Sequence, residues 1–242
     1  MNQMTSSIHE VKVRLEMKDV ARRQGIREYA GTSQEMKEVI CEMLDLVEEK
    51  GLIQGRFLYG IRPLRRINSH TIWLNESVTL RGGALSRLHD AGELAVIVCT
   101  IGDRPEKRVS EYFSAKQALR GLLLDGIASA AVDDVARQAR LAVSEYAASR
   151  GLCSGSPISP GMTGMDIREL TNLFKLVEAG RIGVLLSASS VMVPRKSLAM
   201  LSGIGKSALN ETQEETCRKC LIKSTCPHRV TKKTEKEHSD HL

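Results

Sequence analysis

Apolar side chains in the first hundred residues change between the spacing of strands and the spacing of helices. From residue 11 to residue 17 apolar and charged side chains alternate, which predicts a half-buried strand. Residues 57–61 and 71–74 predict two more strands. Residues 94–100 are continuously apolar, which indicates a central strand buried on both faces.

In other segments the apolar residues have the spacing of a helix. A short helix is expected over residues 18–24, and residues 32–35 read as a capping box before an apolar stripe over residues 36–47. A second capping box, residues 114–117, is expected to start a long helix over residues 119–146. Shorter helices are predicted over residues 106–113 and after the Gly82-Gly83 pair.

The segment from residue 156 to residue 205 begins with a constrained loop. Pro157 and Pro160 fix their own φ angles, and Gly161 allows a backbone conformation or a close approach that a Cβ would prevent. A helical stripe over residues 170–177 follows, and Gly180 is placed as its C-cap.

Two short strands are then predicted, residues 182–186 and residues 191–193, the second ending at Pro194. These elements together predict an α+β fold: a twisted, mainly antiparallel sheet with helices packed against it.

Composition and charge narrow the class of protein. The 242 residues are 42% hydrophobic but only 3% aromatic, so the core is expected to be aliphatic. No apolar run is long enough to span a bilayer and the N-terminus has no signal-peptide pattern, so a cytoplasmic protein is expected.

Most of the net positive charge lies in the tail from residue 217. This tail carries seven Lys and Arg and three Asp and Glu, so its net charge of +4 accounts for most of the total of +6. The rest shows no basic face with stacking aromatics, so nucleic acid is not an expected partner.

Three cysteines in this tail form the clearest candidate metal site. Cys217, Cys220 and Cys226 follow the pattern Cys-x2-Cys-x5-Cys-Pro, whose thiolates suit zinc or an iron–sulfur cluster. The fourth ligand is open: His228, Cys153, an exogenous group or a residue of a partner. Free thiols in a solvated tail are the alternative. Cys41 and Cys99 lie on predicted core elements and are expected to be buried.

The segment starting at Ser156 resembles the activation (reactivation) domain of vitamin B12-dependent methionine synthase, and more closely its free-standing relatives. Pro160 and Gly161 match the Pro-Gly-Tyr loop, with Met162 at the Tyr position and Pro157 at the Arg position. The later Ile-Gly-x-x-Leu-Thr-x-Ser-x-x-Met-x-Pro motif is matched by a set of residues: Ile182, Gly183, Leu186, Ser189, Met192, Pro194 and Ser197, with Ser187 replacing Thr.

A helix pattern of the relatives is matched by Asp125, Ser129, Val132 and Asp133. The resemblance is clearest over residues 90–210 within a domain of residues 1–210, and residues 211–242 form a basic, cysteine-containing tail.

The resemblance implies that this chain supports S-adenosylmethionine-dependent reductive reactivation of a corrinoid methyltransferase. The ligand would be contacted by the following residues: Pro160, Gly161, Met162, Ser187, Ser189 and Ser197. Cobalamin would belong to the partner, and methyl transfer would occur at the partner's cobalt, so the chain is an enzyme only in a loose sense. The sequence contains no nucleophile elbow or zinc-protease motif that suggests catalysis of its own.

The rival hypothesis is an accessory of a corrinoid protein that carries a metal in its cysteine tail, transfers electrons or docks, and no longer binds S-adenosylmethionine. Pro157 and Met162 favour it, because proline lacks the guanidinium that would grip a ligand carboxylate.

Overall fold

The computed structural model describes most of the chain. The described residues are 7–15, 17, 20, 23, 33–68, 70–74, 78–88, 90–162, 164–206, 218 and 224. Of the helix predicted over residues 18–24 only residues 20 and 23 are described, so that prediction stays untested, and the cysteines at 217, 220 and 226 lie outside this set.

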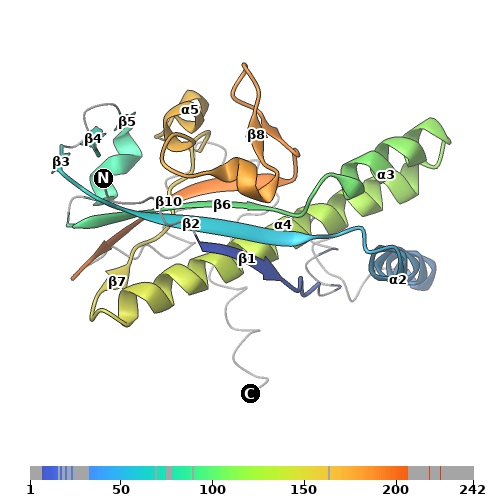
Figure 1. Cartoon of the computed structure of the whole chain (residues 1–242). Helices are drawn as coiled ribbons and strands as arrows, with labels where there is room; N and C mark the ends of the chain where they lie inside the picture. The colour runs from blue at the N-terminus through green and yellow to red at the C-terminus, as the bar shows by residue number, and fades with distance from the viewer. Residues whose placement is uncertain are drawn as a thin grey trace.

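A five-stranded antiparallel sheet forms the centre of the molecule (Figure 1). Its strands, in spatial order, are β1 (Ser7–Val11), β2 (Gly55–Pro63), β6 (Glu93–Thr100), β10 (Ser197–Gly205) and β7 (Cys153–Ser154). Every neighbouring pair in this sheet runs antiparallel. The predicted α+β class with a mainly antiparallel sheet is therefore confirmed.

Strand β6 lies at the centre because its side chains are apolar on both faces. Residues 94–100 are all buried, as their unbroken apolar pattern predicts. Ile97 pairs in register with Tyr59 of β2 on one side and Met200 of β10 on the other. Because successive β6 side chains point to opposite faces, they contribute alternately to two separate hydrophobic cores, one on each face of the sheet.

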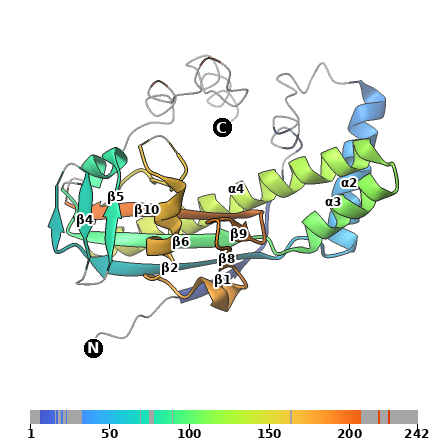
Figure 2. The same cartoon turned by 90° about the horizontal axis from the view of Figure 1, so that it is seen from above.

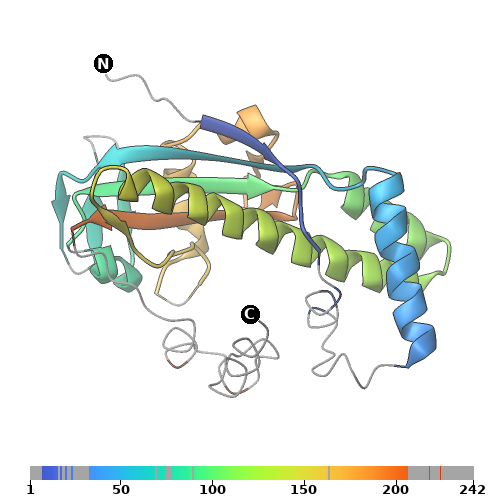
Figure 3. The ribbon, with the colours of Figure 1, turned by 90° about the horizontal axis from the view of Figure 1, so that it is seen from below.

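One face of the sheet is covered by a single long helix, α4 (Ala118–Ala148). Figure 3 shows α4 running along the strands, with α2 (Gln34–Glu49) crossing its end and α3 (Arg104–Ser114) beside it. Ala128, Ala131 and Ala139 are fully buried in the core that α4 shares with the sheet. Small side chains let the helix axis approach the sheet closely, as their clustering in the sequence predicts.

Short elements cover the opposite face (Figure 2). They comprise a small sheet of β3 (Arg66–Ile67), β4 (Thr71–Trp73) and β5 (Thr79–Arg81), the 3-10 helices η2 (Gly83–Leu88), η3 (Ile167–Glu169) and η4 (Ala179–Ile182), the one-turn helix α5 (Leu170–Leu173), and the hairpin of β8 (Leu185–Leu186) with β9 (Met192–Val193). Their buried side chains form the second core, which includes Leu173, Ile182 and Leu201.

Both predicted capping boxes are misplaced. Helix α2 is capped by Ser33, whose hydroxyl accepts the Met36 amide hydrogen at 3.3 Å, one residue later than expected. Ser114 is the last residue of α3 and caps nothing, and α4 begins after Gln117 without a side-chain cap. Between the two helices Lys116 has φ +60°, so the chain reverses through a left-handed residue that the pattern did not reveal.

The segment predicted as one helix over residues 170–177 contains only one α-helical turn, Leu170–Leu173. Gly180 is not its C-cap: Gly183, with φ +77°, ends the later 3-10 helix η4. The strand predicted over residues 182–186 is reduced to two residues for the same reason. The strand predicted from residue 11 to residue 17 is also wrong: β1 is Ser7–Val11, and residues 12–15 are not in a strand. Side-chain periodicity does not distinguish one long helix from several short turns that bury the same residues.

None of the described helices is long and apolar enough to cross a membrane.

Candidate functional site

The loop of residues 156–162 is fastened to β10. Ile158 forms a two-way backbone bridge with Leu201, with both N–H···O distances at 2.8 Å. Just before it, the Gly155 amide donates to the Gly203 carbonyl at 2.8 Å, and the Ser202 hydroxyl donates to the Gly155 carbonyl at 2.6 Å. These four bonds hold the start of the loop against the edge of the main sheet.

The turn that follows depends on Gly161. Its φ is +86°, a conformation that side-chain-bearing residues rarely adopt. Its amide donates to the Met165 carbonyl at 2.9 Å, and the Met162 amide donates to the Ser159 carbonyl at 3.1 Å. A Cβ at position 161 would lie 2.9 Å from Ile167 Cδ1. The expected need for glycine at this position is confirmed, although the close neighbour is a side chain of the protein itself.

Next to this loop, β10 has an open edge. Backbone groups in an antiparallel strand point alternately to the two sides, so Ala199 faces the same side as Leu201. Leu201 is occupied by Ile158, but no strand of the described chain pairs with Ala199 on this side. The peptide N–H and C=O of Ala199 therefore have no backbone partner on this side among the described residues, and the edge is open in this sense, while Ala199 itself is 4% exposed and belongs to the core of this face.

Two of the predicted ligand-contacting serines, Ser187 and Ser189, belong to a tight hairpin turn between β8 and β9. The Ser187 hydroxyl accepts the Val191 amide hydrogen at 3.0 Å and lies 3.0 Å from the Ser189 hydroxyl. Ser190 has φ +60° and is buried, with its hydroxyl 3.5 Å from that of Thr171. These hydroxyls stabilise the turn, and Ser189 remains exposed at its tip. Within the described chain no hydrogen bond joins this turn to the Pro160–Met162 loop.

Ser197 lies inside the molecule. It is only 4% exposed, and its hydroxyl donates to the Thr100 hydroxyl at 2.9 Å. Thr100 Oγ1 in turn accepts the Gly102 amide hydrogen at 3.1 Å, where the chain turns toward α3. Ser197 therefore joins the end of β6 to the start of β10, and its contact with a ligand stays a prediction.

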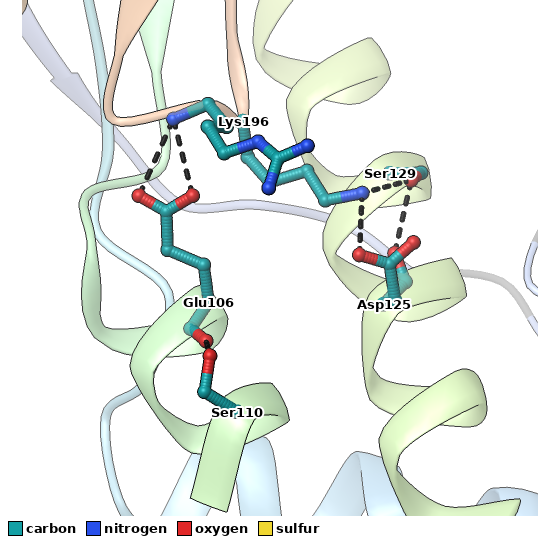
Figure 4. A network of polar contacts seen from close by, with 6 residues as sticks. Glu106, Ser110, Asp125, Ser129 and Lys196 are labelled. Carbon is teal, nitrogen blue, oxygen red and sulfur yellow. Dashed lines mark hydrogen bonds and ion pairs between the residues drawn. The ribbon is translucent and has the colours of Figure 1, made fainter. Parts of the chain in front are cut away.

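A polar cluster that motif reading did not assign joins the start of β10 to helix α4 (Figure 4). Lys196 Nζ lies 2.8 Å from Asp125 Oδ1 and 2.8 Å from the Ser129 hydroxyl. Asp125 and Ser129 belong to the helix pattern of the resemblance, and Lys196, which the motif does not include, lies between its matched residues Pro194 and Ser197. The four-residue spacing of Asp125 and Ser129 already placed them on one helix face; only the tertiary structure brings Lys196 to them.

Helix α3 holds the residue before this lysine. The Glu106 carboxylate accepts the Arg195 amide hydrogen through both oxygens, at 3.1 and 3.3 Å. Ser110 donates to the Glu106 carbonyl at 3.0 Å, one turn along the helix (Figure 4). The Arg195 side chain is exposed. The chain just before β10 therefore presents an exposed cationic side chain, that of Arg195, beside Lys196, whose charge is neutralised by Asp125.

The candidate metal ligands Cys217, Cys220 and Cys226 lie outside the described residues, and their site stays a prediction. Within the described residues no group of three or more His, Cys, Asp or Glu side chains is placed to hold a metal ion. Cys41 is exposed, contrary to expectation, whereas Cys99 is buried as predicted.

Burial raises the pKa of the Cys99 thiol to about 12, so it stays protonated at neutral pH and is a poor nucleophile and metal ligand. This thiol belongs to the core under α4 and takes no part in the candidate site.

No family model and no curated protein sequence matches the chain. Among solved structures the fold is similar to the crystal structure of the MetH reactivation domain bound to AdoHcy, with a TM-score of 0.62. The match covers 87% of this chain and 81% of that domain, at 13% sequence identity. At this identity the comparison establishes a shared fold: the chain has the architecture of the MetH reactivation domain.

Proposed function

We propose that this protein is an accessory of a corrinoid methyltransferase and binds S-adenosylmethionine during reductive reactivation of the partner's cobalamin. The proposal is supported by the similarity in fold to a domain solved with AdoHcy, the demethylated form of that ligand. The carrying observation is local: the glycine-dependent loop of residues 156–162 is bonded to β10 directly beside the open backbone edge at Ala199.

The geometry of this corner suits a small polar ligand. Pre-ordered backbone at a sheet edge offers donors and acceptors without the entropy cost of ordering a loop on binding. Met162 is 58% exposed beside it and offers a flexible apolar surface to a ligand ring. Pro157 gives no charged contact to the ligand carboxylate, so the affinity is expected to be lower than an arginine-containing loop would give.

Isothermal titration calorimetry with S-adenosylmethionine and AdoHcy tests the proposal. Saturable binding is expected in the wild type, and Gly161→Ala is expected to weaken it at least tenfold, because alanine disfavours φ +86°. Gly51→Ala is the matched control, since Gly51 also has a positive φ, +54°, a Cβ there meets only Arg104 Nη1 at 4.0 Å, and the residue follows the end of α2. No saturable binding by the wild type, or equal binding by Gly161→Ala, would contradict the proposal.

The second candidate function is a metal-bearing electron-transfer or docking accessory, favoured by the Cys-x2-Cys-x5-Cys spacing at residues 217–226. The two functions separate in one preparation: anaerobic purification followed by iron and zinc analysis and a visible spectrum. Iron with absorbance that disappears in Cys220→Ser, together with absent S-adenosylmethionine binding, would replace the first function with the second. Ligand binding that survives a Cys217/Cys220/Cys226→Ser triple variant would retain the first.

A further inference from the structure

Arg168 is the only Lys or Arg between residues 151 and 174, a stretch that includes the candidate ligand loop of residues 156–162. The loop itself contains no charged residue. Arg150, the cation just before this stretch, already donates to the Glu93 carboxylate at 2.6 Å. Arg168 belongs to η3, and its side chain is 83% exposed to solvent. This part of the chain therefore has one exposed positive charge to offer a ligand.

Backbone hydrogen bonds and an apolar contact join η3 to this loop. The Gly161 amide donates to the Met165 carbonyl at 2.9 Å, and the Met165 amide donates to the Met162 carbonyl at 3.1 Å. The side chain of Ile167 then returns to the loop, since a Cβ added at Gly161 would be 2.9 Å from its Cδ1. Arg168 directly follows Ile167 in the sequence. The base of its side chain is therefore held one residue away from the contact with Gly161.

Asp166 orients the Arg168 guanidinium and occupies one of its edges. Arg168 Nε donates to Asp166 Oδ1 at 3.0 Å, and Arg168 Nη2 donates to Oδ2 at 2.6 Å. These side-chain hydrogen bonds, together with one from the Arg168 amide, lower the pKa of Asp166 to about 2, so its carboxylate stays charged at neutral pH. The other edge, formed by Nη1 and Nη2, has no hydrogen-bond partner among the described residues. A second carboxylate can bind that edge through two parallel hydrogen bonds.

S-adenosylmethionine carries a carboxylate at the end of its amino-acid chain, and a guanidinium is the side-chain group that best matches its two oxygens. We propose that Arg168 binds this carboxylate through the Nη1–Nη2 edge while Asp166 holds the guanidinium in place. The inference rests on the proposed function, because it requires the ligand to lie at the loop of residues 156–162. Met162 and Ile167, which are 58% and 43% exposed, offer apolar surface to the rest of the ligand.

Calorimetry with AdoHcy and with 5′-methylthioadenosine, which keeps the adenosine and the thioether but lacks the carboxylate, tests this role. Arg168→Gln is expected to weaken AdoHcy binding about tenfold and to leave 5′-methylthioadenosine binding unchanged. Arg168→Lys is expected to weaken AdoHcy binding about threefold, because lysine keeps the charge but loses the paired hydrogen bonds. Arg181→Gln is the matched control: Arg181 is also exposed on this face and paired with a nearby carboxylate, that of Glu178, but lies in η4.

Three results would overturn the role of Arg168 and leave the proposed function intact. The first is wild-type affinity for AdoHcy in Arg168→Gln. The second is an equal loss in Arg181→Gln, which would indicate unspecific attraction to positive charge. The third is an equal loss of 5′-methylthioadenosine binding in Arg168→Gln, which would indicate a disturbed loop instead of a lost carboxylate contact. No saturable binding of S-adenosylmethionine or AdoHcy by the wild type would instead remove the proposed function, and this inference with it.

Discussion

The two faces of the central sheet are covered by opposite means. On one face the single helix α4 satisfies its own backbone hydrogen bonds and contributes a continuous row of small and branched apolar side chains. On the other face short strands, 3-10 turns and loops enclose an apolar core of similar importance. Five of the nine described residues with a positive φ lie on this second face, at Gly82, Gly161, Gly164, Gly183 and Ser190, and the other four flank the helices α2, α3 and α4.

This difference between the two faces indicates that one contributes mainly to stability and the other is better suited to contact a ligand. A long helix on a sheet has few backbone groups to offer a ligand, whereas turns held by a rigid scaffold present them outward. The candidate ligand loop and the serine hairpin both belong to the irregular face, and both are anchored to strands whose other face rests on α4. The comparison predicts that the side chains buried under α4 contribute strongly to stability and that the exposed turns of the irregular face tolerate change better.

The largest expected effect is on the α4 face. Ile97 is fully buried between β6 and α4, and Ile97→Ala is expected to lower the free energy of unfolding by about 2 to 5 kcal/mol, through lost burial and a cavity. Leu185→Ala, on the outer side of the hairpin where the side chain is 63% exposed, is expected to cost about 0.5 kcal/mol or less. Urea denaturation of both variants measures the contrast, and equal losses would refute it.

A smaller effect concerns how the N-terminal segment is held to α4. Burial alone would raise the pKa of Asp134, but hydrogen bonds from the Arg14 amide, Arg137 and Gln138 outweigh burial and lower the pKa below its ordinary value. Because the folded-state pKa is depressed, the stabilisation is complete above the unfolded pKa of about 4 and is lost as the pH falls through the folded-state pKa.

Asp134→Asn is therefore expected to cost about 1 to 2 kcal/mol at pH 7, and progressively less below about pH 4. Urea denaturation at a series of pH values measures this difference. Asp45→Asn serves as the control, because Asp45 is exposed on α2 and has no such partners. A difference between wild type and Asp134→Asn that stays constant down to pH 2 would show that charge is not the source.

The smallest expected effect is at the junction of the two faces. Lys196 contacts Asp125 while its side chain is 20% exposed and that of Asp125 is 51% exposed. Solvent screens such a pair, so a double-mutant cycle with Lys196→Met and Asp125→Asn is expected to give a coupling energy of about 0.5 kcal/mol. A coupling energy of zero would mean that the start of β10 is held by Glu106 and its own strand pairing alone.

The sequence by itself determined the elements whose signals are local. The unbroken apolar run of residues 94–100 could only be a buried strand or helix, and its β-branched composition indicated a strand. The long periodic stripe of α4 and the helix α2 were equally clear. Their ends were not: the hydroxyl that caps α2 belongs to Ser33, one residue after the predicted cap, and the reversal between α3 and α4 depends on a positive φ at Lys116 that the sequence pattern did not reveal.

Only the tertiary structure decided what lies beside what. Periodicity could not separate one helix over residues 170–177 from a series of short turns, since both bury the same side chains against the sheet. It could not turn Ser197 inward to Thr100, bring Lys196 to Asp125, or leave the β10 edge at Ala199 open. These arrangements depend on strand order and register, which long-range packing fixes and which no local stretch of sequence encodes.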